Sequence, residues 1–119
     1  MIENKYIELN TTDNNGNSIY HISIQNDNFE TLKYLFDKLN PNNYLNFYNI
    51  KNNINETLLH AACRKGNQEI ANLIMNKLHE TNRVYDDLLF CKNKDGQNCF
   101  HVAASKGYFN IIEYFLRVN

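Results

Sequence analysis

The stretch INETLLHAACRKGNQEIANLIM, residues 54–75, decides the fold. Its first half places small residues after His60, which permits close approach of a neighbouring helix, and Gly66 then interrupts the pattern. In its second half, apolar residues from Ile70 onward recur at the i, i+3, i+4 spacing of one helical face. The stretch therefore predicts a helix, a tight turn and a second, amphipathic helix.

The same pattern occurs in two further stretches, which align with the first without gaps. NGNSIYHISIQNDNFETLKYLF starts at Asn15, and DGQNCFHVAASKGYFNIIEYFL starts at Asp95. Each copy has a histidine at the same position, namely His21, His60 and His101. Six residues later each copy has a turn residue, namely Asp27, Gly66 and Gly107. Because one helix pair cannot bury both of its faces, three copies in a row predict a stack of helical repeats.

These copies resemble the ankyrin repeat, whose pattern runs roughly D-x-x-G-x-T-P-L-H-x-A-A-x-x-G before an apolar helix. The middle copy matches through Thr57, Leu59, His60, Ala62, Cys63, Gly66, Glu69 and Ile70. The last copy matches through Asp95, Gly96, His101, Ala103, Ala104, Gly107 and Ile111. The first copy is weaker and matches through Asp13, Gly16, Ser18, His21, Glu30 and Leu35. The resemblance covers about residues 5–119 and implies an all-α, ankyrin-like solenoid of helix-turn-helix repeats with short turn or hairpin loops.

The copies depart from the family pattern in one residue type and in length. The family's Pro is replaced by Ile19, Leu58 and Cys99. The histidines are separated by 39 and 41 residues, against a repeat of about 33, so each junction carries extra residues. These junctions include aromatic-rich segments at 44–48 and 84–90. We expect the two segments either to contact a partner or to pack on the second helices of the stack.

The repeat pattern predicts one domain over residues 1–119. Repeat 1 is expected over about residues 11–43, repeat 2 over about 50–83 and repeat 3 over about 91–119, with residues 1–10 as the end of a preceding repeat or an N-terminal cap. Terminal repeats normally need a polar cap, and none follows the third repeat. Exposed outer faces are therefore expected at Tyr108, Phe109, Ile112 and Phe115. This leaves open an excised segment of a longer protein or self-association through uncapped terminal repeats.

The composition excludes several classes of function. Twelve basic and thirteen acidic residues give a formal charge of -1 with no block of either sign, which disfavours a nucleic-acid partner. No apolar run approaches the roughly 18 residues that cross a bilayer, and the N-terminus lacks a secretory signal, so no membrane contact by this segment is expected. The cysteines Cys63, Cys91 and Cys99 have neither disulfide-scaffold nor zinc-site spacing. We expect reduced thiols in a cytoplasmic, intracellular protein.

Two histidine–cysteine pairs are the strongest candidates for chemistry. His60 precedes Cys63 by about one helical turn, and Cys99 lies close to His101. A catalytic cysteine needs an orienting group and an electropositive pocket, and nothing in the sequence specifies either. The resemblance implies instead a buried histidine ring that bonds the backbone and a nearby Thr or Ser hydroxyl. We expect no catalytic residue, no metal site, no cofactor and no enzymatic activity.

The remaining polar motifs favour structural roles. Asp86 and Asp87 are adjacent, so on a helix their side chains point about 100° apart and do not face each other. The turns DNNGN and KDGQN lack the spacing of phosphate-binding loops. They are typical of tight turns, which the many Asn residues also suit.

The binding surface is assigned from the resemblance. It implies that a partner protein contacts the projecting turn tips and the exposed side of the first helices, which together form a concave face. The matching positions are Asn15, Asn17, Gln25, Asn53, Asn55, Glu56, Arg64, Lys65, Lys94, Gln97, Ser105 and Lys106. We expect a protein–protein interaction scaffold. The alternative is a regulatory or substrate-recruiting ankyrin region of a larger enzyme, such as a kinase, an acyltransferase or a ubiquitin-pathway protein.

Overall fold

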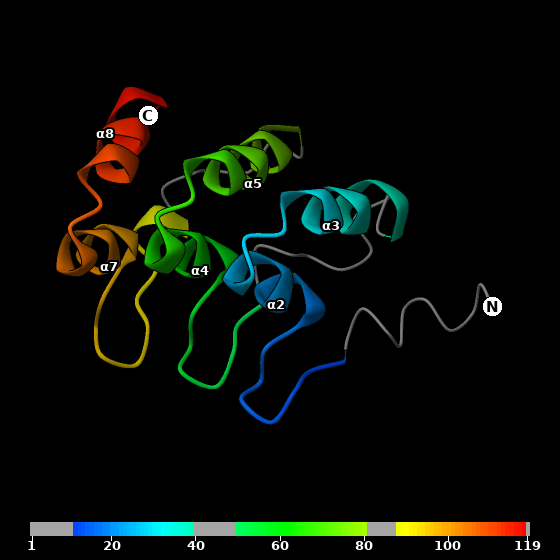
Figure 1. Cartoon of the computed structure of the whole chain (residues 1–119). Helices are drawn as coiled ribbons and strands as arrows, with labels where there is room; N and C mark the ends of the chain where they lie inside the picture. Colours follow the sequence, from blue (N-terminus) through cyan, green and yellow to red (C-terminus); the bar gives the residue numbers. More distant parts are fainter. Residues whose placement is uncertain (1–10, 40–49, 81–87, 119) are drawn as a thin grey trace.

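The computed structural model describes residues 11–39, 50–80 and 88–118. Three helix pairs stack side by side (Figure 1). The first helices of the pairs are α2 (Ile19–Gln25), α4 (Leu58–Lys65) and α7 (Cys99–Lys106). The second helices are α3 (Phe29–Tyr34), continued by the π-helix η2 (Leu35–Leu39), then α5 (Gln68–Glu80) and α8 (Phe109–Val118). An isolated antiparallel bridge between Thr12 and Ser18 is the only β pairing in these ranges, so the predicted all-α solenoid is confirmed.

The helices form two rows, and three loops project from one of them. The helix α4 packs between α2 and α7, while α5 packs against α3 and α8. Figure 1 shows the first helices as one row and the second helices as the other. The loops that precede the first helices, here called fingers, span residues 13–18, 52–57 and 93–98 and point away from the second row. The predicted helix-turn-helix units are therefore present in all three repeats.

Each first helix begins with the same hydrogen-bonded cap. Ser18, Thr57 and Asn98 are the N-caps, and each side chain accepts a hydrogen bond from the backbone N–H of the histidine three residues later. The histidine Nδ1 accepts in return from the backbone N–H of the cap residue. This reciprocal arrangement satisfies two N–H groups at each helix start that would otherwise lack a partner.

The turn between the two helices uses left-handed backbone in every repeat. Gly66 and Gly107 end α4 and α7 with φ of 67° and 77°. Asp27 takes the same position in the first repeat with φ of 54°. A left-handed conformation costs a non-glycine residue roughly 1–2 kcal/mol, although Asp and Asn tolerate it best. The departure at Asp27 thus leaves the turn in place, as the sequence predicts.

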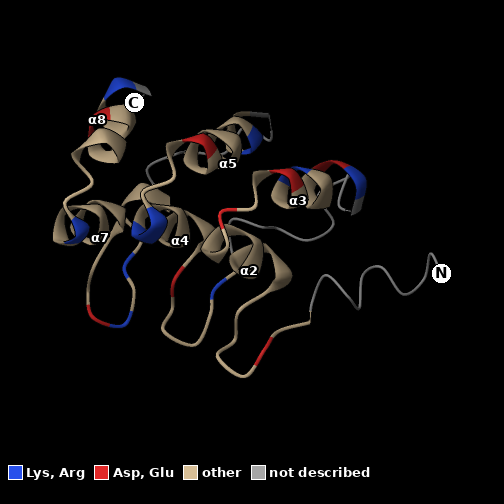
Figure 2. Ribbon diagram, viewed as in Figure 1, with Lys and Arg blue, Asp and Glu red and all other residues tan. Residues whose placement is uncertain are grey.

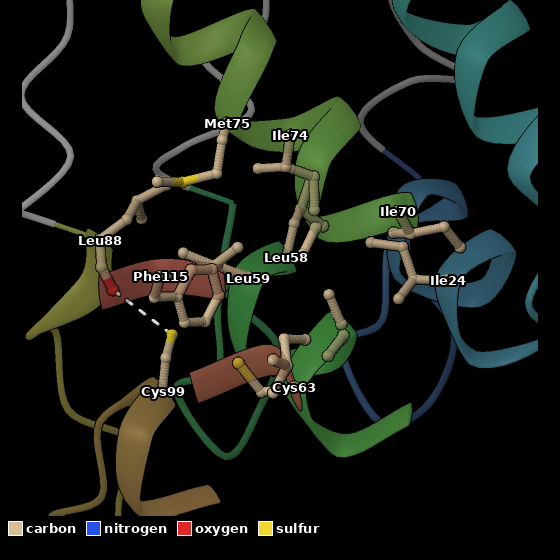
Figure 3. Close-up of a cluster of buried hydrophobic side chains, with 14 of the residues drawn as sticks. Ile24, Leu58, Leu59, Cys63, Ile70, Ile74, Met75, Leu88, Cys99 and Phe115 are labelled. Carbon is tan, nitrogen blue, oxygen red and sulfur yellow. Dashed lines mark hydrogen bonds between the residues drawn. The ribbon is translucent and has the colours of Figure 1, made fainter. Parts of the chain in front are cut away.

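The core lies between the two rows and runs through all three repeats. Figure 3 shows Leu58 and Leu59 of α4 and Ile74 of α5 gathered with Phe115 of α8. All four side chains are fully or almost fully buried. Burying a side chain of this size stabilises a fold by roughly 1.5–3 kcal/mol. The expectation that Phe115 is exposed is therefore wrong, because α8 turns this ring toward α7 and the core while Phe109 and Leu116 face outward.

The junctions are described in part. Leu88 and Leu89 are buried against the stack, whereas Phe90 is exposed and stacks on Phe100 with ring centroids 5.7 Å apart. The segment 44–48 and most of 84–90 lie outside the described residues. None of the helices described is long and apolar enough to cross a membrane.

Candidate protein-interaction surface

Each finger is shaped by one Asx residue at its base. The same repeat position, eight residues before the histidine of each copy, is occupied by Asp13, Asn52 and Asn93. The Oδ1 atom of Asn93 accepts the backbone N–H groups of Asp95 and Gln97, both at 2.9 Å. Asp13 and Asn52 make the equivalent pairs of bonds. Side chains of this kind close turns by bonding the backbone ahead of them, a role that the family resemblance alone does not imply for these three residues.

Neighbouring fingers are joined by backbone hydrogen bonds. The N–H of Asn53 donates to Asn15 O, and the N–H of Lys94 donates to Ile54 O, both at 3.0 Å. Side-chain amides add bonds between fingers, from Asn52 to Asn17 and from Asn93 to Glu56. The three fingers therefore form one continuous, hydrogen-bonded edge.

In each of the first two repeats, one histidine connects the repeat to the finger of the next. The Nε2 atom of His21 lies 2.9 Å from Glu56 O, and that of His60 lies 3.0 Å from Gln97 O. Because Nδ1 accepts from the cap N–H, Nε2 carries the proton and donates to the carbonyl. The buried, structural role that the resemblance implies is thus confirmed for these two rings. For His101 the expectation of burial is wrong, since its ring is exposed and has no following finger among the described residues.

Acid should destabilise the fold through these rings. Burial lowers the pKa of both His21 and His60 and outweighs the hydrogen bonds to the carbonyls, which raise it. Below the ordinary value of 6.5 the unfolded chain binds protons that the folded rings do not, so stability is complete above this pH and falls below it. The slope of the unfolding free energy against pH should approach about 1.4 kcal/mol per pH unit for each histidine ring that titrates. Urea unfolding between about pH 7.5 and pH 5 measures it.

The variant His60→Gln supplies the control for this pH dependence. It removes one of the two titrating rings, so the slope of unfolding free energy against pH should fall to about half. An unchanged slope would assign the pH dependence to other groups.

A buried charge cluster lies at the base of the middle finger. Glu56 is only 2% exposed. Arg64 donates from Nε to Glu56 Oε1 at 2.8 Å and from Nη2 to Oε2 at 2.5 Å, and Asn93 Nδ2 donates to Oε2 at 2.8 Å. Burial opposes ionisation of Glu56, but the hydrogen bonds from Arg64 and Asn93 outweigh it, and the pKa is lowered. The Glu56 carboxylate is therefore ionised and bound by Arg64 and Asn93 within the protein.

The predicted partner-binding residues fall into two groups. Asn17 and Glu56 are buried, and Arg64 is tied to Glu56, so these side chains shape the surface rather than project from it. Asn55 and Gln97 are half-buried. The others lie exposed on the fingers or on the free side of the first helices, namely Asn15, Gln25, Asn53, Lys65, Lys94, Ser105 and Lys106.

The exposed charged residues on and beside the fingers and first helices are mostly basic. Lys51, Lys92, Lys94 and Lys106 are exposed and make no ion pair with any described residue. Two of the acids nearby are occupied, because Glu56 pairs with Arg64 and Asp27 lies 3.4 Å from Lys65. Two finger acids, Asp13 and Asp95, are exposed and make no ion pair within the described ranges. Figure 2 shows basic residues at the middle and last fingers and at the ends of α4 and α7, with acidic residues on the fingers as well.

The histidine–cysteine pairs do not form a reactive site. Cys63 and Cys99 are fully buried free thiols, and Cys99 donates to Leu88 O at 3.6 Å (Figure 3). Burial raises the pKa of Cys99, which disfavours the reactive thiolate. His60 uses both ring nitrogens in structural bonds. No group of side chains suited to a metal ion occurs in residues 11–39, 50–80 and 88–118.

An open groove lies in the second row, between α5 and α8. Gln68, Glu69, Asn72, Tyr114 and Arg117 line it. The Tyr114 hydroxyl donates to Asn72 Oδ1 at 2.8 Å. The lining holds no histidine or cysteine.

Comparison with known proteins identifies the repeats. The family described as ankyrin repeats (3 copies) matches residues 1–86 and 42–119. The chain is 26% identical over 105 residues to the nuclear factor NF-kappa-B p105 subunit of Gallus gallus, covering 88% of this chain and 10% of that protein. It is 42% identical over 49 residues to the I-Kappa-B like protein N1 of Microplitis demolitor bracovirus, covering 41% of this chain and 33% of that protein. The matches thus span a tenth and a third of these two relatives.

Proposed function

Because this chain belongs to the ankyrin-repeat family, we propose that it is a non-enzymatic scaffold that binds a partner protein through its fingers and first helices. The observation that carries the proposal is the continuous, hydrogen-bonded edge of fingers, from which exposed polar and basic side chains project. A surface held in one conformation before binding loses little entropy when a partner docks. The free thiols fit a reducing, intracellular compartment.

The proposed binding set is the exposed part of the face. It comprises Asn15, Gln25, Asn53, Lys65, Lys94, Ser105 and Lys106, together with the half-buried Asn55 and Gln97. Asn17, Glu56 and Arg64 act indirectly in this proposal, because they hold the fingers in position. The names of both relatives contain kappa-B, so NF-kappa-B subunits are the first partners to test.

Charge reversal at two exposed lysines tests the surface. The double variant Lys94→Glu/Lys106→Glu changes residues that lack an ion pair within the described ranges, so the fold should be unaffected. We expect the double variant to lower the affinity for a partner protein captured from cells of the source organism. The dissociation constant should rise by about tenfold or more, which corresponds to about 1.4 kcal/mol. The matched control, Lys38→Glu/Arg117→Glu, reverses two cations of the second row. Equal binding by both double variants would refute this surface.

A regulatory ankyrin region of a larger enzyme is the competing proposal. Reading the gene on both sides of residues 1–119 decides between the two. A catalytic domain in the same reading frame would favour the enzyme, and the lack of one on both sides would exclude it.

A further inference from the structure

The third repeat exposes positions that are buried in the first two. Leu116 is 67% exposed, whereas Phe36 and Met75, which occupy the same repeat position, are 3% and 2% exposed. His101 and Ala104 are likewise exposed, although their counterparts in α2 and α4 are fully buried. In the first two repeats the following repeat packs on these positions, because α2 contacts α4 and α4 contacts α7. The face of α7 and α8 beyond the third repeat, here called the tail, is therefore built to receive another repeat.

The first repeat shows the complementary exposure. Ile22 is 38% exposed, whereas Ala61 and Val102 at the same repeat position are 4% and 1% exposed. Tyr34 is exposed as well, whereas its counterpart Tyr114 is buried. Among the described residues, only the first repeat has no preceding helix pair against this side. The face of α2 and α3 before the first repeat, here called the head, is therefore built to pack behind another repeat.

The polar groups of the two ends are also complementary. Within the chain, two kinds of hydrogen bond join a repeat to the next one. A backbone carbonyl of each of the first two fingers accepts a backbone N–H of the next finger. The histidine of each of the first two repeats donates to the carbonyl that lies four residues before the next histidine. At the tail, the equivalent acceptor is Asp95 O and the equivalent donor is His101 Nε2. Neither atom has an assigned partner in the described ranges. At the head, Asn14 N–H and Asn17 O hold the matching positions. No acceptor within the described part of the chain is assigned to Asn14 N–H.

We propose that the tail of one molecule binds the head of a second copy, so that the stack continues from one chain into the next. In this contact Asn14 N–H of the second copy donates to Asp95 O, and His101 Nε2 donates to Asn17 O. Leu116 and Phe100 pack on the apolar side chains of the head, as Met75 and Leu59 pack within the chain. The new contact is a continuation of the two repeat interfaces already present.

A contact between two tails would leave the Asn14 N–H and the Asn17 carbonyl of both heads without the partners that a neighbouring repeat supplies within the chain. A head-to-tail contact is heterologous, and such contacts give open chains or rings instead of closed dimers. The proposal therefore predicts association that grows with concentration without stopping at two copies.

Two blocking variants of the full chain test the proposal. Ile22→Lys blocks the head and Leu116→Lys blocks the tail, and both residues are exposed, so the monomer should fold. Asn14→Pro removes the head N–H at the second position of the turn that Gly16 N–H closes onto Asp13 O, a position where Pro is favoured. Ile54→Lys is the matched control, because Ile54 is an exposed apolar residue on a finger, away from both ends. Circular dichroism verifies the fold of each variant.

Sedimentation from micromolar to millimolar concentration gives the decisive readout. The unaltered chain and Ile54→Lys should rise in average mass from 14.0 kDa toward several multiples. Each blocked variant alone should stay monomeric, and an equimolar mixture of the two should give a pair and nothing larger, because one supplies a tail and the other a head. Asn14→Pro should weaken association at least tenfold. A monomeric unaltered chain, or a head-blocked variant that still forms dimers, would overturn the proposal.

Discussion

The substitution His60→Ala is expected to lower the free energy of unfolding by about 3 kcal/mol. The ring fills a fully buried site, and its Nδ1 accepts from Thr57 N–H at 3.2 Å. Its Nε2 bonds Gln97 O of the next finger at 3.0 Å. Alanine removes both bonds and leaves a cavity, so the N-cap of α4 and the finger of the third repeat lose support together. Urea unfolding at micromolar concentration measures the loss.

The same substitution at His101 is the matched control. His101→Ala removes the cap bond from Asn98 N–H, but its ring is exposed and bonds no following finger among the described residues. We expect a loss of about 1 kcal/mol. Equal losses at the two positions would show that the contact between repeats contributes nothing measurable.

Reversing the charge at Arg64 should be as damaging. In Arg64→Glu a second carboxylate faces the buried Glu56, whose one remaining side-chain donor among the described residues is the Asn93 amide. Removing one partner of a buried ion pair costs about 3–5 kcal/mol, and the partial exposure of Arg64 places the expected loss near the lower bound. Thermal unfolding followed by circular dichroism measures it.

The neighbouring Lys65→Glu variant controls for charge reversal itself. Lys65 is exposed and its contact with Asp27 is a surface ion pair, so the loss should stay below about 1 kcal/mol. If both reversals cost the same, the cluster around Glu56 is not a structural element. A practical consequence concerns binding assays: reversal at Arg64 or Glu56 would report unfolding, whereas reversal at Lys94 or Lys106 reports the surface.

The features of the fold that could be predicted are those encoded locally. The helix pairs follow from the apolar spacing, and the turns follow from Gly66 and Gly107. The histidine role also depends on a short motif, since the cap residue lies three positions before the ring. The exposure of His101 could not be found in this way, because burial of the ring requires a following repeat that the motif does not contain.

The charge cluster shows why part of the site escaped prediction. Glu56 and Arg64 are eight residues apart, one on a finger and one on a helix, so no helical or strand periodicity pairs them. The third member, Asn93, comes from the next repeat, 37 residues away. Only the stacking of repeats brings the three together. A comparison of the Asx residues at positions 13, 52 and 93 could have indicated the finger bases, because they align in the three copies.

The bridging histidines also determine how the chain comes apart. Each one belongs to one repeat but bonds the backbone of the next, so much of the stabilisation is located at the borders between repeats. The middle repeat takes part in both borders, through Glu56 O on one side and His60 on the other. In such a nearest-neighbour system an end unit frays at the loss of one border, while opening the middle breaks two. The two imidazole rings and the carbonyls that they reach therefore contribute to the cooperativity of the stack, together with the hydrogen bonds between fingers and the shared core.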